Sequence, residues 1–385
     1  MARLAKAEDR HAVSTLELFF DLVFVFAITQ VTALIADDPT GGGVLRGVLL
    51  LALVYWSWVA YSWLGTSARV DDTAATVTML GAMAAMFVVA VLLPVWFGGG
   101  VWAVAAALAY AAVRVMHIVA FYVLGSGSPE LRKATARLGV TVAIAAALLL
   151  AGAIVGGGWQ LLLVLAAVLI DPVGAFLGGG EGWYLSADHF AERHGLIIII
   201  ALGESLIALG LAVSGAAPTA ALLVLVLVGA LLAALVYVLY FRRTAPWLLA
   251  ALEQRTGAEQ ARMGRDVFSY GHFVLIAGIV ALALALKKAT GAVAKYGLTG
   301  DVYGIAGPAL VAAAVLIVGG VVLLRLRAGV GVPATVVAGL LVAMVGGAMA
   351  AVLPLSAVLV VFAAGLALAA VPRRGSTVHG EAAVQ

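Results

Sequence analysis

Long apolar runs separated by short polar breaks fill almost the whole chain. About 20 apolar residues in an α-helix cross the roughly 30 Å of hydrocarbon in a bilayer. The pattern therefore predicts an all-α integral membrane protein with about 12 transmembrane helices, and 10 or 11 if the weakest breaks lie inside spans. We expect spans at residues 13–36, 44–66, 73–97, 100–124, 137–156, 159–178, 193–214, 218–241, 267–288, 302–324, 332–350 and 352–371.

Composition supports this class of protein. Hydrophobic residues make up 65% and charged residues 11% of the 385 residues, which leaves too few polar side chains for a water-exposed surface. The net charge of +3 is small and its cations lie in short connections, so nucleic acid is not an expected partner. The chain has no cysteine, which excludes disulfides, thiol catalysis and cysteine metal sites.

The distribution of cations predicts the orientation. If the N-terminus is cytoplasmic, segments on that side carry 17 of the 22 Lys and Arg residues, and the opposite side carries four. Cytoplasmic loops are enriched in Lys and Arg, so we expect a cytoplasmic N-terminal segment (1–12) and a cytoplasmic C-terminal tail (372–385). The first apolar run lacks a cleavage pattern and is expected to remain as a span.

A weak internal repeat divides the chain into two halves of six helices, 13–178 and 179–371. Glu17 opens the first span as Glu192 opens the seventh, and aromatic runs lie in the second and eighth spans. Parallel repeats of this kind occur in some transporter folds, where the binding sites lie between the repeats.

Charged side chains inside spans are the informative positions, because each costs roughly 2.5–3.5 kcal/mol at a helix centre. Glu17 and Asp21 are four residues apart and share a helix face. One of them must hold a proton or meet a cation from a neighbouring helix. The alternative is that both are solvated at the cytoplasmic interface.

The seventh span carries the densest set of ionisable groups. His189, Glu192 and Arg193 lie at its expected cytoplasmic mouth, and Glu204 lies about halfway across. Arg193 and Glu204 are eleven residues apart and therefore lie on one stripe, which we expect to face the protein interior. The stripe could relay protons or bind a cation; alternatively, Glu204 is a permanent ion-pair partner of Arg114 in the fourth span.

Other polar groups are secondary candidates. His117 shares a face with Arg114, and Asp171 precedes Pro172, which predicts either a broken helix or a simple helix end. At the cytoplasmic start of the ninth span lie Asp266, Tyr270 and His272, either as interfacial anchors or as functional groups. Lys287 and Lys288 are expected to extend to the opposite surface.

Three stretches carry a family resemblance: ELFFDLVFVFAITQ (17–30), HFAERHGLIIIIALGES (189–205) and RDVFSYGHFVLIAGIVALALALKK (265–288). They resemble signature stretches of the low temperature requirement protein A (LtrA) family. The resemblance implies a bacterial multi-spanning protein of the inner membrane, and the growth requirement in the family name defines no molecular activity. The positions that it carries over are Glu17, Asp21, Gln30, His189, Glu192, Arg193 and Glu204.

No HExxH, GxSxG or Walker A motif is present, so zinc proteolysis, serine hydrolysis and nucleotide-driven pumping have no local support. The leading hypothesis is a proton-coupled secondary transporter or permease for a small solute or ion, with protons, membrane lipid and that solute as partners and without a cofactor or metal. Asp21 and Glu204 would titrate, with Arg193 and Arg114 beside them. The oligomeric state is left open by the sequence.

Two other classes remain open. An intramembrane enzyme or lipid-modifying factor would use His189, Glu192 and His272 as acid, base or metal ligands. A structural or sensory membrane protein would need none of these groups to react.

Overall fold

The computed structural model describes residues 13–67, 73–124, 128–177, 180–215, 217–299 and 304–371, and within these ranges it contains helices and no β-strand. The α-helices are α1 (Thr15–Asp37), α2 (Gly41–Ser67), α3 (Thr73–Leu92), α4 (Gly100–Leu124), α5 (Pro129–Val155), α6 (Gly157–Leu177), α7 (Ala187–Ser214), α8 (Ala220–Tyr237), α9 (Ala245–Glu253), α10 (Gly257–Met263), α11 (His272–Tyr296), α12 (Ala306–Arg327), α13 (Ala334–Ala348) and α14 (Leu355–Ala370). Short 3₁₀ turns, η1 (Leu93–Gly98) and η5 (Met349–Ala351), follow α3 and α13, and π-helical segments η3 (Val238–Arg242) and η4 (Gly264–Gly271) follow α8 and α10.

Ten helices in the described ranges are long and apolar enough to cross a membrane. Three of these are composite: α3 continues through η1 to Gly98, α8 continues through η3 and α9 to Glu253, and α10, η4 and α11 are continuous from Gly257 to Tyr296. The apolar helices α13 and α14 have 15 and 16 residues, which at 1.5 Å per residue gives about 22–24 Å. The predictions of an all-α membrane protein and of 10 to 12 helices are confirmed.

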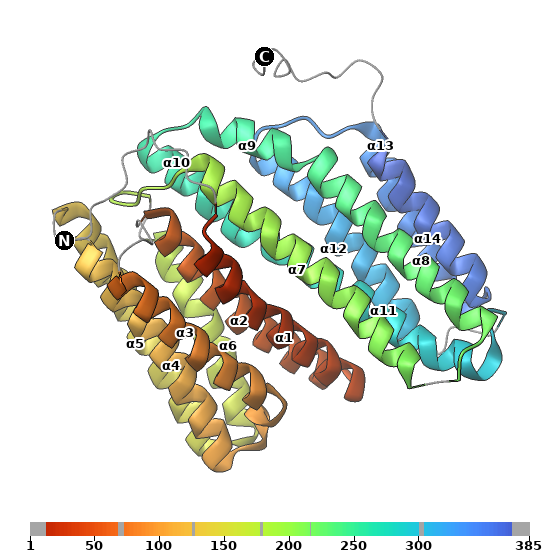
Figure 1. Ribbon diagram of the computed structural model, residues 1–385, viewed down its shortest axis with the longest axis horizontal. Coiled ribbons are helices and arrows are strands. Elements are labelled where there is room, and N and C mark those ends of the chain that lie inside the picture. Colours follow the sequence, from red (N-terminus) through yellow and green to blue (C-terminus); the bar gives the residue numbers. More distant parts are fainter. Residues whose placement is uncertain are drawn as a thin grey trace.

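The helices form two groups on either side of a central layer (Figure 1). Helices α3 to α6 lie on one side, α8 and α11 to α14 lie on the other, and α1, α2 and α7 lie between them. Helix α1 packs against α2, α3, α7 and α11, so it contacts both groups. This central layer is where the two predicted halves meet, and the duplication itself stays a prediction.

Outward faces carry large apolar side chains. Leu22 is 59%, Trp102 is 62% and Leu177 is 78% exposed. Such surfaces are rare on water-soluble monomers and are stable in contact with lipid.

Helix α6 passes through Pro172 and ends at Leu177, so the predicted break or end at this proline is wrong. The end of α6 is held by side chains from η4. The Tyr270 hydroxyl donates to the Pro172 carbonyl at 2.6 Å, and Arg265 donates to the carbonyls of Ala175 and Phe176 at 3.2 and 3.1 Å. These donors satisfy carbonyls at the C-terminal end of α6, where the helix offers few backbone N–H partners of its own.

Candidate functional site

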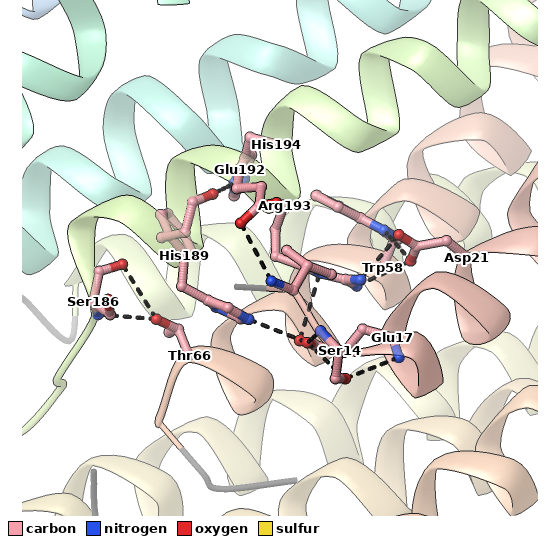
Figure 2. A network of polar contacts seen from close by, with 12 residues as sticks. Ser14, Glu17, Asp21, Trp58, Thr66, Ser186, His189, Glu192, Arg193 and His194 are labelled. Atoms are coloured by element: carbon pink, nitrogen blue, oxygen red, sulfur yellow. Dashed lines mark hydrogen bonds and ion pairs between the residues drawn. The ribbon is translucent and has the colours of Figure 1, made fainter. Parts of the chain in front are cut away.

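A buried pair of charges joins α1 to α7. Arg193 donates from Nη1 to Asp21 Oδ2 and from Nη2 to Asp21 Oδ1, both at 2.9 Å (Figure 2). The Trp58 indole N–H in α2 donates to Asp21 Oδ1, also at 2.9 Å. The planar guanidinium matches both carboxylate oxygens, which is the strongest geometry for such a pair. Asp21 therefore meets a cation from a neighbouring helix, one of the two alternatives predicted for it.

Glu17 extends this site toward the start of α1. Its carboxylate caps the helix: Glu17 Oε2 accepts from the Ser14 N–H at 2.9 Å, and Ser14 Oγ accepts from the Glu17 N–H at 3.2 Å. His189 Nε2 lies 3.1 Å from the same Oε2, and Arg193 Nε lies 3.8 Å from Oε1. Glu17 is 1% and Asp21 is 2% exposed, so the alternative of two solvated carboxylates is wrong.

A glycine makes room for the Glu17 carboxylate. A Cβ at Gly65 in α2 would collide with Glu17 Oε1 and would lie 3.7 Å from His189 Cε1. One residue later, Thr66 Oγ1 accepts from the Ser186 N–H at 2.9 Å, which ties the end of α2 to the start of α7. Helix α2 is therefore the third helix that shapes the site, together with α1 and α7.

The charges of this network require one proton. Glu17 and Asp21 can each carry a negative charge, while Arg193 supplies one permanent positive charge. Since an uncompensated charge is costly in a buried site, the neutral state needs a proton on His189 or on one carboxyl group. The 3.1 Å contact between His189 and Glu17 is the place where such a proton can be shared. The network can thus take up and release a proton.

Glu192 lies at the edge of this network. Its side chain is exposed, and its Oε2 accepts from the Val13 N–H at 3.2 Å. The structure therefore brings together Glu17, Asp21, His189 and Arg193 among the predicted site residues, with Glu192 beside them.

Glu204 is buried separately in the middle of α7, with 0% of its surface exposed. As predicted, Arg193 and Glu204 both face the protein interior. Neither Glu204 oxygen makes a hydrogen bond of normal geometry to the described residues. The polar groups that act on it are the Thr32 hydroxyl in α1 and the Lys287 ammonium in α11. Lys287 is half-buried, so its ammonium group acts on Glu204 in the interior and also reaches the surface.

Arg114 forms its ion pair with Asp171, not with Glu204. The Arg114 Nη2 donates to Asp171 Oδ2, and the Thr141 hydroxyl donates to Asp171 Oδ1 at 3.1 Å. Both charged side chains are at least 95% buried. The hypothesis of an Arg114–Glu204 lock is therefore wrong. Helix periodicity gives the face on which Arg114 lies but not the helix opposite that face, so the sequence could not decide between Asp171 and Glu204 as its partner.

His272 is fully buried, so of the two alternatives for this residue the interfacial anchor is wrong. Its Nε2 lies 2.6 Å from the Tyr240 hydroxyl, and its ring centroid lies 5.1 Å from that of His194. Asp266 accepts from Arg265 Nε at 2.7 Å, and Tyr270 binds α6 as described. Gln30 is half-buried in α1 away from these contacts, and His117 is buried beside Arg114.

Trp58, His194 and Tyr240 take part in these contacts without having been predicted as site residues, and Lys287 was expected only to extend to the surface. The His194 ring centroid lies 5.0 Å from that of Trp58, so aromatic rings lead from Asp21 toward His272. The aromatic runs in the second and eighth spans were a signal for Trp58 and Tyr240, and the basic pair near the end of the ninth was a signal for Lys287.

Together, the apolar helices and the buried ionic network define a multi-spanning membrane protein with charged groups at its central helix contacts. The family model described as "Bacterial low temperature requirement A protein (LtrA)" matches residues 12–371, and the chain belongs to this family. The predicted family resemblance is confirmed. An uncharacterized protein of Rhizobium meliloti (strain 1021) is 25% identical over 286 residues, which cover 72% of this chain and 69% of that protein. No solved structure matches the chain.

Proposed function

We propose that this protein is a proton-coupled secondary transporter or permease for a small solute or ion in the bacterial inner membrane, with both termini in the cytoplasm. One observation carries the proposal: the buried network of Glu17, Asp21, His189 and Arg193 joins the helices of the two halves and needs one proton for neutrality. Intramembrane ionisable residues of this kind mark ion and proton pathways.

Protonation would change the energy of the contact between α1 and α7. With one added proton the network is neutral and its packed form is stable. Without that proton it carries a net negative charge, which is costly in a buried site unless water or a cation enters. The two protonation states therefore favour different packings of the central helices, and a solute that binds one packing better is coupled to the proton.

Glu204 provides a second protonatable group deeper in the same helix. It lacks the ion pair that holds Asp21, and its surroundings offer Thr32 and Lys287. A carboxyl group without a permanent partner can gain and lose a proton without breaking a salt bridge. Glu204 is therefore the proposed relay between the network and the opposite side of the membrane.

The test is proton movement into proteoliposomes under an imposed membrane potential, followed with a pH-sensitive dye. Wild type should show flux, and Glu204→Gln and Asp21→Asn should lose most of it. Glu259→Gln, which neutralises an exposed carboxylate in α10, should retain it. Absence of wild-type flux, or equal flux in all four proteins, would overturn the proposal. Thermal unfolding of each protein separates lost coupling from lost folding.

No contact among the described residues specifically supports the enzymatic alternative. His189 Nε2 contacts the Glu17 carboxylate, His272 Nε2 contacts the Tyr240 hydroxyl, and Glu192 is exposed. Among the described residues, no group of three or more His, Asp or Glu side chains is arranged to hold a metal ion. The transporter is therefore the function that the geometry favours.

A further inference from the structure

A cavity of about 80 Å³ lies among α2, α4, α5 and α6 and is bordered by η4. At roughly 10–15 Å³ per water this is room for about five to eight water molecules. It is separate from the buried network, but both sites use α2: Trp58 faces Asp21, whereas Trp56 and Trp63 line the cavity.

The charged lining of the cavity is cationic. Arg114, Arg137 and Arg265 line it, and no Asp or Glu is among the described lining residues. Arg114 pairs with Asp171 through Nη2, whereas Arg265 donates both to Asp266 and to the carbonyls of Ala175 and Phe176. Arg137 is exposed and makes no ion pair with the described residues. The local charges therefore favour an anion.

Two of the lining side chains are buried with donors to spare. Arg114 is 3% and His117 is 1% exposed. Arg114 Nη1 makes no hydrogen bond to the described residues, and neither ring nitrogen of His117 makes one of normal geometry, although the Ala60 backbone lies close to that ring. Buried polar groups are normally paired. Their presence at a cavity indicates that a ligand accepts hydrogen bonds from them.

The remaining walls combine four large aromatic side chains with small and aliphatic residues. Trp56, Trp63, Trp183 and Phe121 line the same space. The Trp63 indole N–H donates to Ser269 Oγ at 2.9 Å, so this ring is held in place. Aromatic faces bind flat apolar groups and leave the polar end of a ligand to the cations.

We infer that this cavity binds a small organic anion, a carboxylate with an apolar or aromatic body. The carboxylate accepts from Arg114 Nη1 and His117, Arg137 attracts it at the open side, and the tryptophans contact the body. When the ligand is bound, the Arg114 guanidinium group contacts both the ligand and Asp171. That this anion is the transported solute rests on the proposed function; the binding itself does not.

In the experiment, the purified full-length protein is titrated with benzoate, and binding is measured by calorimetry. Benzamide, which is uncharged and has the same shape, is the comparison ligand. Benzoate should bind saturably, and benzamide at least about tenfold more weakly, because it lacks the charge-assisted hydrogen bonds. Arg137→Gln should weaken benzoate binding about threefold or more, and His117→Phe about tenfold. Lys133→Gln removes an exposed cation from the same helix, outside the cavity, and should change binding less than about twofold.

The inference would be overturned by a lack of saturable benzoate binding, by equal binding of benzamide, or by unchanged binding in both cavity variants. A fourth arm repeats the titration in phosphatidylcholine nanodiscs with and without phosphatidylglycerol. Displacement of benzoate by the anionic lipid would assign the cavity to a lipid headgroup and overturn a free anion as its ligand. Benzoate binding without proton flux in proteoliposomes supports the cavity and contradicts the proposed function, whereas flux without binding contradicts the cavity alone.

Discussion

Arg193 in α7 donates hydrogen bonds from both terminal nitrogens to the carboxylate of Asp21 in α1. The two residues are 172 positions apart in the chain, and both are buried. This contact joins the two groups of helices through side chains that are costly to bury singly. It therefore makes the packing of α1 on α7 dependent on charge.

Removal of the Arg193 charge should destabilise the protein strongly. Arg193→Gln leaves two buried carboxyl groups with one fewer cation, and a broken buried pair costs on the order of 3–5 kcal/mol. Arg193→Lys keeps the charge but cannot form the two-pronged contact, so its melting temperature should lie between those of wild type and Arg193→Gln. Thermal unfolding in detergent measures both. In a double-mutant cycle with Asp21→Asn the losses should be less than additive; strict additivity would contradict direct pairing.

A methyl group at Gly65 should disturb the network without removing any charge. Gly65→Ala places a Cβ against Glu17 Oε1, so the Glu17–His189 contact must open. We expect a lower melting temperature and reduced proton flux. The matched control is Gly210→Ala in α7, where an added Cβ meets nothing within 4 Å. This control should be neutral or stabilising by up to about 1 kcal/mol, because alanine is the better helix former. Equal effects of the two substitutions would show that crowding at Glu17 is not the cause.

Because Arg114 pairs with Asp171 and not with Glu204, two conservative substitutions should differ in their effect on stability. Asp171→Asn removes the buried counter-charge of Arg114 and should lower stability by on the order of 3 kcal/mol. Glu204→Gln removes no ion pair with Arg114 and should leave the melting temperature nearly unchanged. Unfolding temperatures of the two variants, purified identically, test this difference. The reverse order would favour the Arg114–Glu204 pairing.

Single cysteines can test the predicted orientation directly, because the chain has none of its own. Glu130→Cys and Gly331→Cys lie in exposed positions on the predicted cytoplasmic side, and Gly41→Cys lies at the exposed start of α2 on the other side. In intact cells an impermeant maleimide should label only Gly41→Cys, and after permeabilisation it should label all three. Labelling of the first two in intact cells would reverse the topology.

The sequence alone was sufficient for the class of protein and for finding the charged residues within apolar runs, because both depend on local composition. Apolar runs indicate helices wherever the solvent is lipid, and a charged residue within such a run stands out against its neighbours. Glu17, Asp21 and Arg193 were recognisable for this reason. Helix ends were less certain: α7 begins at Ala187 rather than at residue 193, and His189 in its first turn packs inside the protein.

The tertiary structure alone decided which charge meets which. Asp21 could have met any intramembrane cation, and Arg114 any carboxylate, because a helix periodicity gives the face of a residue and not the helix opposite that face. The partners come from segments as distant as Asp21 and Arg193, and the cavity beside Arg114 arises only where α2, α4, α5 and α6 converge. The chain thus determines locally what must be buried, and the packing of the helices determines what each buried group contacts.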